Sequence, residues 1–273
     1  MGNEWNAMTY EGKDNILHVV RREAAQMMSL ASEPGVWERQ TGSEKWQVRD
    51  VIGHLVDTTE GYFVSFDAAR GNGSVGEPYG TVPMAERVNE KAQEFRSIPQ
   101  EEMLSRLHDD FEKFYGIMDA LTEDEWSNLI VSHYYMGPLP AFFYPAFQLM
   151  DYGVHSWDIR QGMGRAHGLA GDAADLLAPF MLILWSATAS TENAGEPFEV
   201  GIRVTSGPNA ADYKVRVAKD GFAHEVASID GLPVVFEFDP ASLVLTAFGR
   251  VNAGTFRGDP ALADQFLNLF FRI

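Results

Sequence analysis

Apolar side chains recur at two different periods along the chain, and the change between them falls near residue 190. In the first part apolar residues return every three or four positions, which is typical of helices with one buried face. This pattern predicts helices over residues 13–32, 46–70, 84–120 with a break near Pro99, a stretch that contains 150–164, and 171–190. The first part of the chain is therefore expected to be a bundle of helices.

Beyond residue 197 apolar and polar positions alternate with period two, as in half-buried strands. The alternation predicts strands at 198–205, 213–218 and 233–239, with a hairpin turn at Lys219 to Gly221 and helices at 240–250 and 260–273. We therefore expect an α plus α+β protein, with a helical bundle over residues 1–190 and a small α+β domain over residues 198–273. The polar segment 191–197 marks the expected boundary.

Three ionisable side chains share one helix face in the segment "MDYGVHSWDIRQGMG" at residues 150–164. Asp151, His155 and Asp158 are spaced by four and three, so they project to the same side of the predicted helix. Burying a carboxylate or an imidazole without a partner costs several kcal/mol. These side chains must either satisfy one another or hold a metal ion.

A metal would need a further ligand from a neighbouring helix, and His54 is the best candidate. His54 lies at the edge of the apolar stripe of the helix predicted over residues 46–70. Asp57 follows it by three residues, as Asp158 follows His155, so each aspartate can accept a hydrogen bond from the second imidazole nitrogen. The alternative is that each histidine lies at the edge of the core and is hydrogen-bonded locally. His133 is the next candidate ligand if Asp151 does not bind.

The charge balance disfavours anionic macromolecules as partners. The 273 residues include 39 acidic and 21 basic side chains, for a net charge of −18. Such a surface repels phosphate backbones and anionic lipids, so we expect neither nucleic acid nor membrane as a partner. A small anionic substrate would need a basic residue inside its own pocket.

The sequence contains no cysteine. Disulfides, cysteine ligands and a thiol nucleophile of the protein itself are thereby excluded, and any thiol chemistry needs an external thiol. The apolar run at residues 176–189 is shorter than a membrane span and contains Pro179. No secretory signal is recognisable, so a cytoplasmic location is expected.

Several motifs resemble those of one known family. "W-x-V-R-D-V-I-G-H-L" at residues 46–55, "D-x-x-x-H-S-W-D-I-R-x-x-x-G" at 151–164 and the lead-in "GPLPAFFYPAFQLMD" resemble the DinB-like four-helix bundle of mycothiol-dependent maleylpyruvate isomerases. The segment "LVLTAFGRVNAGTFRGDPALADQFLNLF" is similar to their second domain, which is related to sterol-carrier proteins. The resemblance covers nearly the whole chain.

The resemblance implies a metal site and a thiol cosubstrate. His54 and His155 match the two histidines that hold a divalent metal, usually zinc, in that family, and Asp151 stands where the isomerase has glutamate. Mycothiol would occupy the open metal position as a thiolate and act as the nucleophile. If the thiolate adds to a cis double bond of the substrate and then leaves, the protein is an isomerase. If the thiolate stays attached to the substrate, the protein is an S-transferase.

The resemblance also singles out Arg250, in "FGR", as the residue that holds a substrate carboxylate. The alternative is that Arg250 is a helix C-terminal cation facing solvent. Aromatic residues would line an apolar pocket beside the metal if their segment folds over it, although such clusters are more often core; they are Tyr134, Tyr135, Phe142, Phe143 and Tyr144.

A small-molecule substrate and a monomer or homodimer are expected. Two other functions stay open: a metal-dependent hydrolase or cyclase that uses no thiol, and a non-catalytic protein that binds a small ligand.

Overall fold

The computed structural model describes residues 3–165 and 168–271. The chain divides into two compact units, one reaching Leu169 and the other beginning at Ala170. Each unit has its own arrangement of elements, and each is taken in turn.

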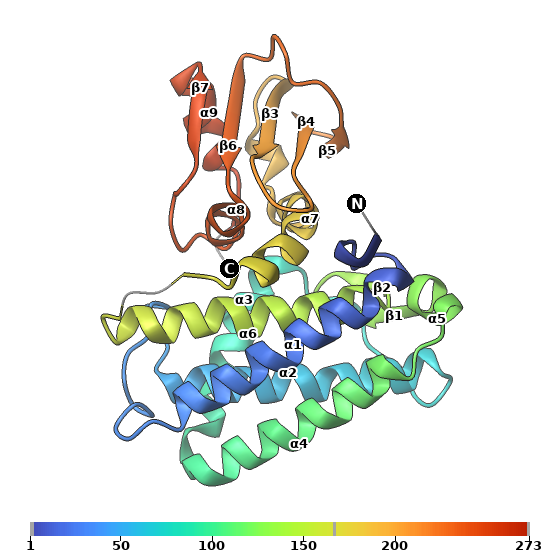
Figure 1. Ribbon diagram of the computed structural model, residues 1–273, viewed down its shortest axis with the longest axis vertical. Helices are drawn as coiled ribbons and strands as arrows, with labels where there is room; N and C mark the ends of the chain where they lie inside the picture. The colour runs from blue at the N-terminus through green and yellow to red at the C-terminus, as the bar shows by residue number, and fades with distance from the viewer. Residues whose placement is uncertain (1–2, 166–167, 272–273) are drawn as a thin grey trace. The chain divides into compact units, whose positions relative to one another are not determined.

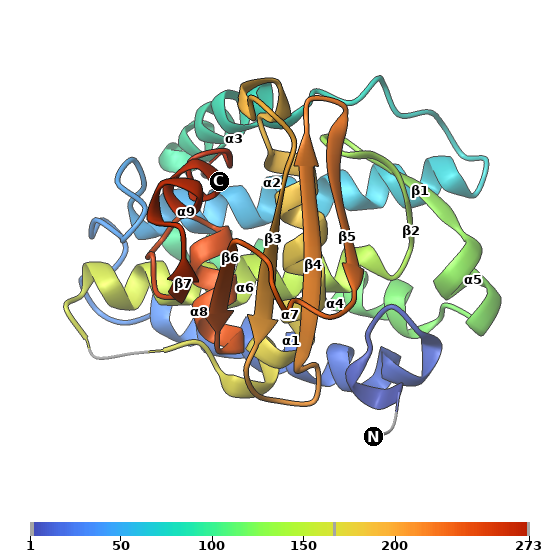
Figure 2. The same ribbon diagram turned by 90° about the horizontal axis from the view of Figure 1, so that it is seen from above.

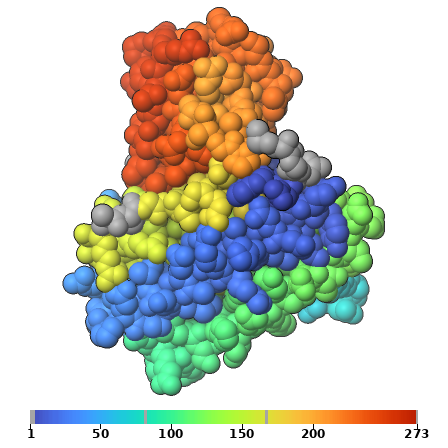
Figure 3. Space-filling view, in the orientation of Figure 1, coloured from blue at the N-terminus to red at the C-terminus, as the bar shows by residue number. Residues whose placement is uncertain are grey.

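Four long helices form the N-terminal unit: α1 (Lys13–Ala31), α2 (Val48–Ala69), α4 (Gln100–Asp119) and α6 (Phe143–Gly162). Helix α1 packs against α6, and α2 packs against α4 (Figure 1). Side chains close the space that the ribbon leaves between α1 and α4 (Figure 3). Helix α3 (Thr81–Glu94) lies against α2, and the short α5 (Glu123–Asn128) follows α4. The predicted bundle is confirmed.

Buried stripes at helical spacing explain why these segments are helices. In α4 the buried residues are Met103, Leu107, Phe111, Phe114 and Met118, so one face of the helix is apolar throughout. The expected break near Pro99 is also present, because α3 ends at Glu94 and α4 begins at Gln100. Proline has no N–H to donate, so it is accommodated just before the first turn.

A small hairpin was not predicted from the sequence. Strands β1 (Ile130–His133) and β2 (Gly137–Pro140) pair antiparallel, with Val131 opposite Leu139, and β1 packs on α2. The prolines of this stretch suggested an irregular lead-in to α6. Four residues per strand are too few to establish a period-two pattern, so the hairpin is visible only in the structure.

The C-terminal unit contains a mixed sheet. Within the described residues, five strands lie in the order β5 (Gly221–Val226), β4 (Ala211–Ala218), β3 (Phe198–Val204), β6 (Val234–Phe238) and β7 (Thr255–Gly258) (Figure 2). Strands β3 and β6 are parallel, and the other neighbours are antiparallel. The expected strands and the turn at Lys219 are confirmed, whereas the short edge strand β7 was not predicted.

The helix predicted over residues 171–190 belongs to the C-terminal unit and not to the bundle. This helix, α7 (Gly171–Thr188), packs against α8 (Pro240–Ala247). Its Trp185 contacts Phe238 and Phe266 at ring-centroid distances of 6.1 and 5.7 Å. The boundary therefore falls at residue 169 and not at 190–197. Periodicity identifies a helix but does not say which core receives its apolar face.

The last helix, α9 (Pro260–Leu267), is shorter than the predicted 260–273. Phe270 instead pairs with Ala189 in an isolated bridge, and its ring stacks on Trp185 at 4.9 Å. Residues 272 and 273 of that prediction lie outside the described residues. Among the helices that the structure describes, none combines the length and the apolarity needed to cross a membrane.

Candidate metal site

Three predicted ligands come together between α2 and α6. His54 lies on α2, and Asp151 and His155 lie one turn apart on α6. One donor atom of each residue lies within 4.8 Å of the other two. His54 Nε2 is 3.5 Å from Asp151 Oδ1, and the two imidazole centroids are 5.2 Å apart. The structure therefore groups the three residues that the spacing and the resemblance indicated.

The arrangement suits a divalent metal such as zinc. Ligand atoms about 2.1 Å from a tetrahedral zinc lie about 3.4 Å from one another, close to the separation between His54 and Asp151. The side chains of these two residues are only 11% and 17% exposed, so little water competes for the donors. Two imidazoles and one carboxylate leave a fourth position open, as in catalytic zinc sites.

Asp158 orients the imidazole of His155. Its Oδ2 lies 2.9 Å from His155 Nδ1, and the carboxylate is fully buried. Burial lowers the pKa of His155, and the Asp158 carboxylate opposes that shift, so the imidazole is neutral at pH 7. Donation from Nδ1–H to Asp158 leaves the lone pair of Nε2 for a metal. The predicted hydrogen bond between these residues is confirmed.

The corresponding prediction for His54, a hydrogen bond to Asp57, is wrong. Thr58 Oγ1, not the Asp57 carboxylate, lies 3.2 Å from His54 Nδ1. Asp57 instead accepts a hydrogen bond of 3.1 Å from Arg87 on α3. Residues three and four positions along a helix both lie near the first, so spacing allows either partner. Arg87 holds the Asp57 carboxylate toward α3, and Thr58 is the residue that reaches the imidazole.

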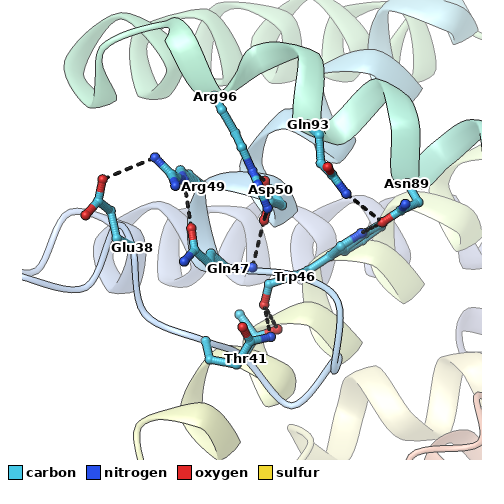
Figure 4. A network of polar contacts seen from close by, with 10 residues as sticks. Glu38, Thr41, Trp46, Gln47, Arg49, Asp50, Asn89, Gln93 and Arg96 are labelled. Carbon is cyan, nitrogen blue, oxygen red and sulfur yellow. Dashed lines mark hydrogen bonds and ion pairs between the residues drawn. The ribbon is translucent and has the colours of Figure 1, made fainter.

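Trp46 packs against both candidate histidines. Its ring centroid lies 5.0 Å from that of His54 and 5.5 Å from that of His155, and the residue is 9% exposed. The indole Nε1 donates to Asn89 Oδ1 at 3.2 Å, and Gln93 donates to the same oxygen (Figure 4). Trp46 therefore forms a wall that excludes water from the histidines. Sequence reasoning assigned it no role, and its place in the motif at 46–55 was the one available signal.

A close backbone approach holds the loop of Trp46 over α6. Gly42 N–H donates to the Asp158 carbonyl at 2.7 Å, and the Thr41 hydroxyl donates to the Trp46 carbonyl at 2.8 Å. A Cβ at Gly162 would lie 2.0 Å from the Gln40 carbonyl oxygen, so only glycine permits this packing.

Asp151 acts electrostatically on His133 and on several tyrosines, among them Tyr62 and Tyr135. Burial lowers the pKa of His133 to about 4, with Asp151 opposing, and its Nδ1 accepts from the backbone N–H groups of Tyr135 and Met136. Burial raises the pKa of Tyr62, and Asp151 raises it further. Burial also raises the pKa of Tyr135 to about 12, where Asp57 and Asp151 add to the shift and Arg87 opposes it. These groups are neutral at pH 7.

The remaining aromatic residues are divided between core and surface. Tyr144 is fully buried, and Phe142 and Phe143 stack on each other at 4.7 Å. Tyr134 and Tyr135 are only half-buried, next to α3 and the segment that precedes it.

Asp57 and Asp158 each follow a candidate histidine ligand by three residues, so replacing them tests whether a hydrogen bond to the histidine supports metal binding. We expect Asp158→Asn to weaken zinc affinity roughly 10- to 100-fold, because the hydrogen-bonded charge that fixes the His155 tautomer is lost. Asp57→Asn, which does not touch His54, should change the affinity less than about threefold. Competition with a chromophoric chelator measures both constants. Equal losses in the two variants would contradict this assignment.

Arg250 lies in the C-terminal unit, three residues after the end of α8. Its Nη1 donates to the Phe248 carbonyl at 3.0 Å. The residue lines a cavity of about 240 Å³ within that unit, together with Trp185, Asn252 and Asn268. A carboxylate-binding role for Arg250 stays a prediction.

Comparisons with known proteins identify the family and the fold. The family model of the mycothiol maleylpyruvate isomerase N-terminal domain matches residues 19–160. A crystal structure of the mycothiol-dependent maleylpyruvate isomerase is 14% identical with a TM-score of 0.58, covering 89% of this chain and 92% of that chain. A histidine-to-alanine mutant of the isomerase gives 13% identity with the same coverage and TM-score.

These two structures bear on the fold and extend over both units. A comparison with curated proteins found no match. The matched segment contains α2, nearly all of α6 and all three candidate ligands, and it spans more than half of the chain. The resemblance noted in the sequence is confirmed: the chain belongs to the mycothiol maleylpyruvate isomerase N-terminal domain family.

Proposed function

We propose that this protein is a metal-dependent enzyme that uses a low-molecular-weight thiol of the mycothiol type, either to isomerise a small electrophile or to attach the whole thiol to it through a carbon–sulfur bond. One observation carries the proposal: His54, Asp151 and His155 converge within 4.8 Å in a chain of this family. Zinc is the expected metal, because two imidazoles and a carboxylate suit it.

A divalent metal at this site would lower the pKa of a coordinating thiol, so that the sulfur is a thiolate at neutral pH. The residues of the chain prepare the site for that chemistry. Asp158 holds the His155 tautomer, and Trp46 keeps water from both imidazoles. Exclusion of water strengthens the electrostatic interactions of an anionic nucleophile.

The sulfur must come from outside, because the sequence contains no cysteine. In an isomerisation the thiolate forms a carbon–sulfur bond with one carbon of a cis double bond, and the electron pair moves to an adjoining carbonyl. Rotation about the resulting single bond and loss of the thiolate give the trans product. The electron pair returns from the carbonyl as the thiolate leaves, so the thiolate is regenerated unchanged and no oxidant or reductant is needed.

The test combines metal analysis with a thiol titration. Zinc-loaded protein is mixed with maleylpyruvate and either mycothiol or glutathione, and turnover is followed by ultraviolet absorbance. We expect isomerisation to require both zinc and a thiol, with mycothiol more effective than glutathione. A stable carbon–sulfur product detected by mass spectrometry identifies the transferase version.

Other outcomes would reject the proposal. Thiol-independent hydrolysis or ring closure would favour a metal-dependent hydrolase or cyclase. Protein that binds no metal stoichiometrically, yet holds a small apolar ligand, would favour the non-catalytic alternative.

Arg250→Ala tests the proposed carboxylate contact. A charge-assisted hydrogen bond is worth about 1.5–3 kcal/mol, so kcat/KM on an anionic substrate should fall about 10- to 100-fold. Zinc content and thiol affinity should be unchanged, and a neutral substrate should lose little. Equal losses on charged and neutral substrates, or none at all, would make Arg250 a structural residue.

A further inference from the structure

Three acidic residues of α2 pair with arginines of neighbouring elements, and one pair differs from the other two. Arg96 donates hydrogen bonds to the Asp50 carboxylate from Nε and Nη2, at 2.6 and 2.7 Å. Arg106 on α4 donates to the Glu60 carboxylate from the same two nitrogens, at 2.7 and 2.9 Å. Both arginines thus use their Nε–Nη2 edge, the geometry in which guanidinium binds a carboxylate with two parallel bonds.

Arg87 on α3 donates to the Asp57 carboxylate from Nη1 alone, at 3.1 Å. The same nitrogen donates to the Tyr135 hydroxyl at 3.3 Å. Its Nε and Nη2 donate to no residue that the structure describes, and the side chain is 29% exposed. The edge that Arg96 and Arg106 use for a carboxylate is therefore unoccupied and accessible in Arg87.

Two sets of contacts connect this guanidinium with the region of the metal site. Asp57, which holds it, follows the ligand His54 by three residues on α2. Tyr135, its second partner, has its ring 5.5 Å from that of His133, and both residues lie within electrostatic reach of Asp151. Short chains of contacts therefore connect the Arg87 side chain to the region of the triad, one through Asp57 on α2 and one through Tyr135 in the β1–β2 hairpin.

The surroundings of Arg87 favour an anion as its ligand. Tyr135 accepts a hydrogen bond from Arg87, so its own O–H remains to donate to a bound group. The ring of Tyr79 lies 5.6 Å from the guanidinium and 6.2 Å from the Tyr135 ring, so the cation has aromatic neighbours on one side. With a net charge of −18 the protein repels anions at long range, and a held cation beside the reacting atoms would offset that repulsion.

We propose that the Nε–Nη2 edge of Arg87, together with the Tyr135 hydroxyl, binds a carboxylate of the substrate beside the metal site. This inference rests on the proposed function and narrows its substrate class to small electrophiles that carry a carboxylate. Arg87 and Tyr135 are substrate-binding residues in this view, and Asp57 positions the guanidinium. The site lies within the N-terminal unit and is independent of Arg250.

The experiment measures binding without turnover. Zinc-loaded full-length protein is titrated calorimetrically with maleate, a cis dicarboxylate, and with maleamide, its neutral diamide. We expect Arg87→Met to weaken maleate binding at least about tenfold and to leave maleamide binding unchanged. Arg106→Met is the matched control, since it breaks a more exposed ion pair of the same helix, and it should change maleate affinity less than about twofold.

Two milder variants keep the test decisive should Arg87→Met fail to fold. Arg87→Lys retains the charge but not the two-nitrogen edge, so it should lose about three- to tenfold in maleate affinity. Tyr135→Phe removes one donor and should lose several-fold. Zinc content, measured for each variant, should equal that of the wild type.

The inference is overturned if Arg87→Met binds maleate as the wild type does, or if it loses maleate and maleamide equally. A loss in Arg250→Ala with none in Arg87→Met would also overturn it. Its failure is distinguishable from failure of the proposed function. Maleate binding that depends on Arg87, with no thiol-dependent turnover, rejects the function alone. Turnover with maleate binding indifferent to Arg87 rejects this inference alone.

Discussion

Replacing His155 or His54 with alanine is expected to abolish stoichiometric zinc binding. Each variant leaves two of the three candidate ligands that converge within 4.8 Å. Loss of a residue that only hydrogen-bonds to a metal ligand costs about 10- to 100-fold in metal affinity, so loss of the ligand itself should cost more than about 100-fold. Turnover should fall by at least the same factor. Elemental analysis after dialysis against metal-free buffer measures the content.

Thermal unfolding provides an independent readout of the same change. A ligand present at 100 times its dissociation constant stabilises the folded state by about 2.7 kcal/mol. For a unit of this size that stabilisation corresponds to a Tm increase of about 5–10 °C. Added zinc should therefore raise the Tm of the wild type but not that of His54→Ala or His155→Ala. His108→Ala, at an exposed position of α4, is the control and should respond as the wild type does. Wild-type zinc content in both ligand variants would show that the triad is wrong.

The helices of the bundle could be predicted because each buries a long stripe. Helix α4 shows this most clearly, with buried residues at helical spacing from Met103 to Met118. The hairpin of β1 and β2 and the edge strand β7 lacked such a signal. Each of these strands has four residues, too few to establish a period in the sequence, and β7 is exposed along its whole length.

The boundary between the units could not be read from periodicity. Helix α7 is apolar on nearly every side, with eleven of its 18 residues buried. Such a helix fits any core, and the polar segment 191–197 after it suggested a linker. In the structure Ala194 in that segment is fully buried, and its carbonyl accepts a hydrogen bond from Gln265 of α9. The segment is a connection inside the C-terminal unit.

The candidate site was only partly predictable. Spacing within one helix brought Asp151, His155 and Asp158 together, because residues three and four apart share a face. The pairing with His54 needed a neighbouring helix; the place of His54 at the edge of an apolar stripe made it a candidate, and the resemblance supported it. Helical spacing did not separate Asp57 from Thr58 as the partner of His54, since both lie within one turn of it. The role of Trp46 depends on a loop, whose path follows from tertiary contacts with α6.

Asp151→Ala is expected to weaken zinc binding more than about 100-fold, whereas Asp151→Glu is expected to stay within about tenfold of the wild type. The carboxylate supplies the single negative charge of the triad, and its Oδ1 lies 3.5 Å from His54 Nε2. The resemblance noted in the sequence implies glutamate at this position, and glutamate is one methylene longer. The space between α2 and α6 should accept that methylene, because Asp151 is not completely buried.

Asp151→Asn removes the negative charge of the side chain but keeps its size, so it separates the contributions of charge and of shape to zinc binding. Its amide oxygen is a weaker zinc ligand than a carboxylate, so its affinity should lie between those of the alanine and glutamate variants. Asp109→Ala, at an exposed acidic position of α4, controls for the change in net charge and should bind zinc normally. Unchanged affinity in Asp151→Ala would mean that the third ligand lies elsewhere. His133 would then be the residue to replace, through its Nε2, because backbone N–H groups already occupy its Nδ1.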